Sequence, residues 1–214
     1  MDILVLGAGG HIGTAVTQEL LTGHSVTALT HQQYDVNRPR WPIGEITQPA
    51  SLDAVICCVG HCPAGGFANA VARPLSQYND FELMSGINMH IIGPFNVFQQ
   101  VLTLLRSGAC FVFMSSAATR LLQMPRDKRP PALNIYPHLA VMAAEDALIE
   151  GMRMDPAVID RDIKIHKIMP PAIGDSPFHR GGPKLPTTVT TEEVVRAICS
   201  CLPARNHQDV NMVP

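Results

Sequence analysis

The sequence has few charged residues and no long hydrophobic run. Asp, Glu, Lys and Arg make up 16% of its 214 residues and the net charge is −2, so bulk electrostatics gives no reason to expect a nucleic-acid or polyanion partner. No apolar stretch reaches the roughly 18 residues needed to span a bilayer. The first apolar run, Ile3–Leu6, meets glycines at once, without the basic flank or the length of a signal peptide. We therefore expect a soluble, cytoplasmic protein with no membrane or nucleic-acid partner.

The sequence also lacks the cysteine spacing of a metal site. Its six cysteines are Cys57, Cys58, Cys62, Cys110, Cys199 and Cys201. Most fall in expected strands or helices of a cytosolic domain, where free thiols are usual. Cys57, Cys58 and Cys62 lie close to His61, but adjacent cysteines on a strand face opposite sides and no second pair has zinc-finger spacing. We predict packed thiols and no metal.

What the sequence does contain is an alternation of strand and helix patterns. Its length suits a single domain spanning residues 1–214. Apolar runs predict strands at Ile3–Leu6, Ser25–Leu29, Ala54–Val59, Cys110–Met114 and Ile163–Met169, with weaker candidates at Tyr34–Asn37 and Val210–Val213. Apolar spacing of three and four predicts helices at Ile12–Leu21, Asn79–Leu105, His138–Met152 and Thr190–Leu202, the last opened by a capping box of Thr190 and Glu193.

Proline- and glycine-rich segments separate these elements. They are predicted as loops, at Arg38–Pro49, Pro63–Gly66, Ala117–Asn134 and Pro170–Pro186. The alternation predicts an α/β fold with a doubly wound parallel sheet, whose ligands bind at the carboxyl ends of the strands. Gly10, Gly60, Ser116 and Pro170 all follow such ends.

The first expected strand runs directly into a glycine-rich turn. Gly7-Ala8-Gly9-Gly10-His11-Ile12-Gly13 has the G-x-x-G-x-x-G pattern between a strand and a helix. Glycines there permit a tight turn and let a pyrophosphate approach backbone N–H groups at the positive end of the helix. The alternative is a glycine turn with no ligand, but the strand and helix on either side favour a dinucleotide.

The chain resembles the short-chain dehydrogenase/reductase family over nearly its whole length. Gly7, Gly10 and Gly13 match the family's glycine motif, and Asp35-Val36 is similar to the pair that contacts adenine. Cys57-Cys58-Val59-Gly60 stands where Asn-Asn-Ala-Gly is usual, Val112–Ser116 resembles the strand that ends in the catalytic serine, and Ile165–Asp175 resembles the segment around the Pro-Gly motif. The resemblance implies a Rossmann-like fold, an NAD(P)(H)-dependent oxidoreductase and a small carbonyl or alcohol substrate.

By position the resemblance assigns catalysis to Ser116 and Tyr136. The family's lysine, four residues after the tyrosine, is replaced by Ala140, and His90 stands at the position of its proton-relay asparagine. A tyrosine with a pKa near 10 is a poor base at neutral pH without a nearby cation. Pro137 also disfavours a helical conformation at Tyr136. Each residue therefore keeps an alternative: a packing aromatic for Tyr136, a hydroxyl bonded to its own backbone for Ser116, and a core histidine for His90.

His138 lies one turn into the same helix and is a further candidate for the missing cation. The cofactor-binding residues implied by the motif and the strand ends are Gly7, Gly9, Gly10, His11, Ile12, Gly13, Thr30, His31, Asp35, Val36, Cys58, Val59, Gly60, Met114, Pro170 and Ile173. Asp175 stands where the family has a phosphate-binding threonine, so its carboxylate has to turn away from a pyrophosphate.

The second expected strand ends in Thr30-His31-Gln32-Gln33, without the acidic residue that excludes a 2′-phosphate. This favours NADP(H) over NAD(H).

Three functions remain open at this level. The first is the oxidoreductase, the second is a non-redox NADP(H)-binding sensor or structural protein, and the third is another small-molecule reaction without a dinucleotide. The basic residues between Arg120 and Arg129 are expected to form a solvated lid, or alternatively to hold an acidic substrate. Members of the family often form homodimers or homotetramers, here expected through Asn79–Leu105 and His138–Met152.

Overall fold

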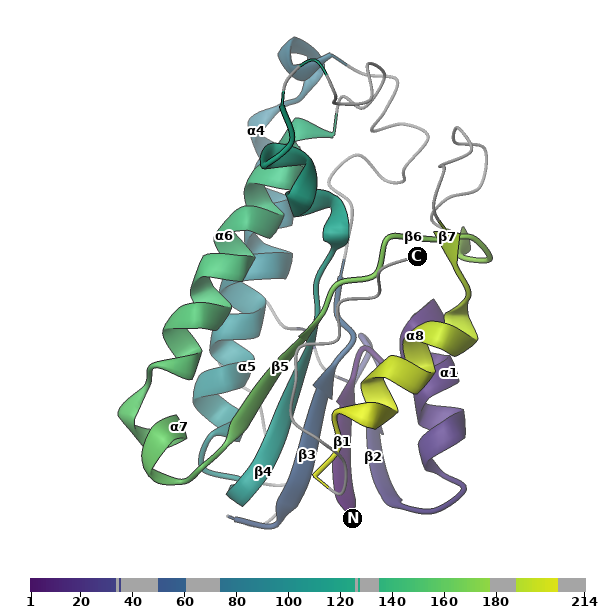
Figure 1. The fold of residues 1–214 in the computed structure, drawn as a ribbon, viewed down its shortest axis with the longest axis vertical. Helices are drawn as coiled ribbons and strands as arrows, with labels where there is room; N and C mark the ends of the chain where they lie inside the picture. Colours follow the sequence, from purple (N-terminus) through teal and green to yellow (C-terminus); the bar gives the residue numbers. More distant parts are fainter. Residues whose placement is uncertain are drawn as a thin grey trace.

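Five parallel strands form the central sheet of the protein (Figure 1). The structure is a computed structural model that describes residues 1–33, 35, 50–60, 74–125, 127, 135–177 and 188–203. The strands are β1 (Asp2–Leu6), β2 (Ser25–Leu29), β3 (Leu52–Cys57), β4 (Leu105–Met114) and β5 (Lys164–Ile168), in the order β2-β1-β3-β4-β5. All neighbouring pairs are parallel. The predicted doubly wound α/β fold is confirmed.

Helices cover both faces of this sheet. Helices α1 (His11–Leu20) and α8 (Thr191–Ser200) lie on one face, and α5 (Gly93–Val101), α6 (Tyr136–Arg153) and α7 (Pro156–Asp160) lie on the other (Figure 1). Successive strand residues point to opposite faces. Leu4 and Leu6 of β1 therefore join the core under α5 and α6, whereas Ile3 and Val5 join the core under α1 and α8.

The strand order determines where a ligand can enter. The chain leaves β1 for β2 on one side and returns to the other side of β1 as β3. The carboxyl ends of β1 and β3 therefore meet at the point where the winding direction reverses, which is the usual ligand crevice of such sheets. A small second sheet, β6 (Ala172–Ile173) with β7 (Thr188–Val189), lies within and after the segment predicted as a loop from Pro170 to Pro186.

The prediction of one continuous helix over Asn79–Leu105 is wrong, because the helix is interrupted and ends earlier. Helix α4 (Asp80–Ile87) passes into a π-helical turn, η2 (Asn88–Ile92), before α5 begins. Pro94 lacks an N–H and its ring clashes with the carbonyl four residues earlier, and a widened turn relieves both conflicts. The helix ends at Val101, because Leu105 already pairs with Leu52 as part of β4.

Two other predicted boundaries also move. Strand β4 begins at Leu105 and not at Cys110, with a register shift between Leu52 and Ala54 and a positive φ of 77° at Gly108 that the absence of a Cβ permits. Three-ten helices form at η1 (Leu75–Gln77) and, within the predicted loop 117–134, at η3 (Ala117–Leu122).

The capping box of α8 is confirmed: Thr190 Oγ1 accepts the Glu193 N–H at 3.2 Å, and Thr190 N–H donates to Glu193 at 2.7 Å.

Some predictions lie outside the described residues. These are the strand candidates Tyr34–Asn37, apart from Asp35, and Val210–Val213, the loops Arg38–Pro49 and Pro63–Gly66, and the cofactor residue Val36. His61 and Cys62, residues 126 and 128–134 of the predicted lid, and residues 178–186 of the last predicted loop lie outside them as well. No helix among the described residues is long and apolar enough to cross a membrane.

Candidate functional site

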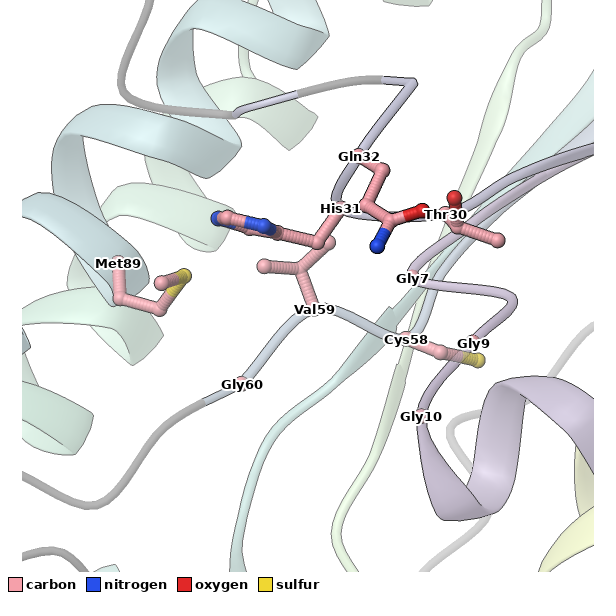
Figure 2. A pocket seen from close by; sticks show the side chains of 10 residues that line it. All are labelled: Gly7, Gly9, Gly10, Thr30, His31, Gln32, Cys58, Val59, Gly60 and Met89. Carbon is pink, nitrogen blue, oxygen red and sulfur yellow. The ribbon is translucent and has the colours of Figure 1, made fainter.

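A pocket of about 520 Å³ opens at the carboxyl ends of β1, β2 and β3 (Figure 2). That volume is within the usual range for a site that holds a small molecule or cofactor. Gly7, Gly9 and Gly10 of the turn after β1 lie on one side of it with Cys58 next to them, and the side chain of Met89 on η2 lies on the other. The lining residues are Gly7, Gly9, Gly10, Thr30, His31, Gln32, Cys58, Val59, Gly60 and Met89.

The turn between β1 and α1 can be built only with glycine at two of its positions. Gly7 has a φ of 76°, and a Cβ there would lie 2.9 Å from the backbone carbonyl of Cys58. A Cβ on Gly13 would lie 2.1 Å from the carbonyl oxygen of Gly7. The first turn of α1 is therefore pressed against the end of β1, and its N-terminus faces the crevice between β1 and β3.

The N-terminus of α1 carries no side-chain cap. Gly10 is the N-cap residue, and no side chain accepts a hydrogen bond from the first turn. By contrast, Asn79 and Thr190 cap α4 and α8 through their side chains. The backbone N–H groups at the start of α1, together with the helix dipole, form an environment suited to an anion such as a pyrophosphate. This open glycine cradle fits a dinucleotide.

The turn after β2 forms another wall of the pocket. Gln33 uses its side-chain oxygen to accept the Thr30 N–H at 2.9 Å and the Thr30 hydroxyl at 3.0 Å. This holds the turn closed and leaves His31 and Gln32 on the pocket wall, with the His31 ring directed toward the side where Met89 lies (Figure 2). None of the described residues of this turn, 30–33, is acidic.

Half of the predicted cofactor residues line this pocket: Gly7, Gly9, Gly10, Thr30, His31, Cys58, Val59 and Gly60. The others described are not among its lining residues. Ile12 and Gly13 are in the first turn of α1, Met114 ends β4, Pro170 follows β5, and Ile173 is in β6. Gln32 and Met89 line the pocket without having been predicted. Met89 is brought there by the π-helical turn, which periodicity does not predict.

His11 is engaged with the start of α8 and not with the pocket. Its Nε2 lies 2.7 Å from Thr191 Oγ1, and Thr191 N–H donates to the Asp175 carboxylate at 3.0 Å. Slight burial opposes ionisation of Asp175, but hydrogen bonds from Thr191 outweigh it and lower the pKa of the carboxyl group. The Asp175 carboxylate is therefore bound to the N-terminus of α8.

Ser116 follows β4 and caps η3. Its Oγ accepts the Ala118 N–H at 3.1 Å. This is the local bond to the backbone that was the alternative to a catalytic role for Ser116. Because the accepted N–H leaves the hydroxyl proton uncommitted to that contact, Ser116 retains a donor. The same geometry thus accommodates both interpretations.

Tyr136 is the first residue of α6, so the expectation that Pro137 would exclude it from the helix is wrong. Proline is tolerated in the first helical turn, where its missing N–H would lack an intrahelical partner anyway. Ala140, which replaces the family's lysine, is an exposed residue of the same helix. No ammonium group is supplied from this position.

His90 and His138, both singled out from the sequence, belong to a group of ionisable residues whose other members the sequence reasoning missed: Glu145, which is buried, and Asp146 and Lys167, which are half-buried. His90 lies 3.5 Å from Glu145, and Ser115 donates to Asp146, which lies 3.3 Å from Lys167. His138 contacts the His90 ring edge to face at a centroid distance of 6.0 Å. Glu145 could have been found, because it lies three residues after Met142 and four before Ile149, on the apolar stripe of its helix.

The described residues contain no cluster of three His, Cys, Asp or Glu side chains that could hold a metal ion. The described cysteines, 57, 58, 110, 199 and 201, are free thiols. Burial, the largest cause, raises the pKa of Cys57 to about 12. A thiol of that kind packs as an apolar group and does not act as a nucleophile at neutral pH.

Known structures share this fold across almost the whole chain. The protein lin1944 from Listeria innocua is 19% identical, with a TM-score of 0.72 over 98% of this chain and 96% of its own. A short chain dehydrogenase from Burkholderia cenocepacia in complex with NADP is 16% identical, with a TM-score of 0.71 over 97% and 86%. The 3-alpha-hydroxysteroid dehydrogenase from a Pseudomonas species, complexed with NADH, is 16% identical, with a TM-score of 0.65 over 94% and 89%. The Rossmann-like fold that the resemblance implied is confirmed.

The sequence itself matches one family. Comparison with curated protein sequences finds no significant match. Residues 3–120 match the model of the NAD dependent epimerase/dehydratase family. This segment is 118 residues long, more than half of the 214, and it contains the glycine turn, the ends of β2 and β3 and Ser116. The chain therefore belongs to the NAD dependent epimerase/dehydratase family.

Proposed function

We propose that the protein is an NADP(H)-dependent oxidoreductase of short-chain dehydrogenase/reductase type that acts on a small carbonyl or alcohol substrate. The observation that carries the proposal is the pocket at the reversal point of the sheet, bordered by the uncapped N-terminus of α1 and the close glycine turn at Gly7 and Gly13. Such an arrangement suits a pyrophosphate with the rest of a dinucleotide extending along the carboxyl edge of the sheet. Family membership supports the same cofactor class.

The composition of the β2 turn supports NADP(H) over NAD(H). A carboxylate at this turn would bond a ribose 2′-hydroxyl and repel a 2′-phosphate. Thr30, His31 and Gln32 occupy the pocket wall here and carry no negative charge. The hydroxyl proton of Thr30 is bound to Gln33, so the side chains of His31 and Gln32 are the ones that offer hydrogen-bond donors. The similar structures include one holding NADP and one holding NADH, so the preference rests on these residues alone.

Ser116 and Tyr136 are the proposed catalytic residues, because they follow β4 and begin α6 at the same edge of the sheet. The bound cofactor would supply or accept the hydride. Ser116 would donate its hydroxyl proton to the substrate oxygen, an orientation favoured by the Ala118 N–H bound to its Oγ. Tyr136 would supply the proton that the substrate oxygen takes up in reduction.

The absence of an ammonium group four residues after Tyr136 favours a second candidate, an NADP(H)-binding sensor without redox activity. A titration of NADPH followed by a screen of aldehydes and ketones separates the two. If the protein is an oxidoreductase, we expect it to oxidise NADPH. Tyr136→Phe should then lose turnover and keep its affinity for NADPH. Tight NADPH binding without oxidation of any carbonyl would favour the sensor, and unchanged turnover in Tyr136→Phe would remove the tyrosine from the mechanism.

We further infer that the protein forms a homodimer or homotetramer through the helices α4 to α6. Large apolar side chains are exposed along α4, η2 and α5: Phe81 at 81%, Met84 at 49%, Ile92 at 44% and Phe95 at 40%. Several exposed large apolar side chains on consecutive helical segments of a protein with few aromatic residues favour an interaction surface.

A further inference from the structure

Two ionisable side chains face one another inside the protein, between η2 and α6. His90 is 4% exposed and Glu145 is 1% exposed, and His90 Nδ1 lies 3.5 Å from Glu145 Oε1. Burial raises the pKa of Glu145, and His90 and Ser115 partly offset this effect. Leucine or methionine at position 145 would avoid the desolvation cost of the carboxyl group. The pair therefore calls for an explanation other than stability.

The pair adjoins the candidate cofactor pocket. Met89, the neighbour of His90 on η2, lines that pocket together with Gly60, and both lie on the side away from Gly9 and Gly10 (Figure 2). A Cβ added to Gly60 would lie 3.6 Å from Cε1 of His90. Because Cε1 is bonded to both ring nitrogens, the nitrogen-bearing edge of His90 lies against the residue that forms the pocket wall.

Two other side chains near the pair, His138 and Cys57, are uncharged at neutral pH. Burial and the proximity of His90 lower the pKa of His138, which reaches His90 from α6, to about 4. Cys57 on β3 interacts electrostatically with Glu145, and its pKa is raised to about 12, chiefly by burial. Neither side chain supplies a positive charge to the carboxyl group of Glu145.

The charged groups on the sheet side of the pair are engaged with one another. Ser115, after β4, donates to Asp146 Oδ1 at 3.0 Å and also stabilises the ionised form of Glu145. Asp146 in turn lies 3.3 Å from Lys167 Nζ on β5. Asp146 is thus paired with Lys167, although its charge still raises the pKa of Glu145. His90 is the ionisable partner that Glu145 faces from η2.

We propose that Glu145 is a positioning residue that accepts the Nδ1–H of His90, so that Nε2 of His90 is the nitrogen that exchanges a proton at the Gly60 wall of the pocket. At 3.5 Å the two atoms are slightly beyond the roughly 2.7–3.2 Å of a formed N–H···O bond. Such contacts are often long in ligand-free sites and tighten on binding. A carboxylate behind an imidazole fixes its tautomer and stabilises its protonated form, as in other acid/base pairs.

The inference rests on the proposed function in one respect, which is the need for a proton. Reduction of a carbonyl adds a hydride to carbon and a proton to oxygen. Tyr136 would give that proton to the substrate oxygen, and the His90 imidazolium would release a proton from Nε2 to the site to restore the Tyr136 hydroxyl. His90 would then be neutral imidazole, and solvent would reprotonate it. The pair would thus take over the role of the cation that is absent at Ala140.

The test is a ¹⁵N-imidazole NMR titration of the cofactor-free protein, with His90→Gln used to identify the His90 signals. We expect Nδ1 of His90 to be protonated in the wild type. In Glu145→Gln we expect the proton affinity of His90 to fall about tenfold or more. Asp146→Asn is the matched control, because this neighbouring carboxylate faces Ser115 and Lys167, and it should leave the His90 tautomer unchanged. An unprotonated Nδ1 in the wild type, or the same His90 titration in Glu145→Gln, would overturn the proposal.

A second measurement applies if Glu145→Gln does not fold. In His90→Gln, ¹³C-carboxyl NMR should show the pKa of Glu145 rising above its wild-type value, and an unchanged value would overturn the pairing. Adding NADPH to the wild type should shift the His90 signals, because its ring adjoins the pocket wall. If NADPH raises the melting temperature but leaves these signals unchanged, delivery of a proton to the pocket is overturned. If NADPH does not bind while the Glu145 effect on His90 is present, the proposed function fails and the pairing stands.

Discussion

Gly13 lies directly against Gly7, so close that a Cβ on Gly13 would be 2.1 Å from the Gly7 carbonyl oxygen. This contact joins the first turn of α1 to the end of β1. It aligns the N-terminus of the helix with the crevice at the carboxyl ends of β1 and β3, where the pocket lies.

Gly13→Ala should therefore destabilise the protein by about 2 kcal/mol or more, because the new methyl group meets a backbone atom that no side-chain rotation can move. Urea denaturation measures the change. Gly151→Ala is the matched control, since nothing lies within 4 Å of a Cβ at that helical glycine. It should be neutral or stabilising by up to about 1 kcal/mol. Equal stability of Gly13→Ala and the wild type would contradict the close packing.

His138 should make stability depend on pH in the acid range. Its pKa is lowered from 6.5 to about 4 by burial and by His90. Between these two pH values the His138 side chain is protonated in the unfolded chain and neutral in the folded protein. The stabilisation present above pH 6.5 is lost as the pH falls toward 4. The shift of about 2.5 units corresponds to at most ~3 kcal/mol at 1.36 kcal/mol per unit.

His138→Gln should remove this part of the pH dependence. Denaturation of both proteins at pH 7.5 and near pH 4.5 gives the comparison, and the stability of the variant should fall less between the two. A loss as large in His138→Gln as in the wild type would show that other groups cause it.

Phe95→Glu should weaken the proposed oligomer, because a charge would enter an apolar surface. Light scattering coupled to gel filtration should show the mass approaching that of one 23.2 kDa chain. Ile159→Glu is the control, since Ile159 is 62% exposed on α7, which lies at the opposite end of α6 from α4 (Figure 1), and should not change the mass. A wild-type monomer would contradict the proposal.

Sequence reasoning predicted the order of strands and helices and the location of the pocket, because both depend on local patterns. An apolar run such as Ile3–Leu6 indicates a buried strand, and glycines such as Gly7 and Gly13 indicate a tight turn. The break before Pro94 and the start of β4 at Leu105 were missed, since one depends on relief of a backbone clash and the other on pairing with Leu52. A helical pattern gives no indication of such long-range partners.

The candidate site was only partly predictable for the same reason. Residues that follow strand ends, such as Thr30 and Gly60, were placed correctly at the pocket, because a parallel sheet collects those ends at one edge. Met89 reaches the pocket through a π-helical turn. Glu145 meets His90 only because α6 packs on η2, a tertiary contact between residues 55 positions apart in the sequence.

The most direct test of the account is the effect of nucleotides on thermal stability. NADPH or NADP⁺ at about 100 times its Kd should stabilise the native protein by about 2.7 kcal/mol, which raises the melting temperature by several degrees. NADH and NAD⁺ at the same concentration should raise it less, because residues 30–33 carry no acidic side chain. An unchanged melting temperature with all four nucleotides would contradict the central claim that the pocket at Gly7–Gly13 holds a dinucleotide.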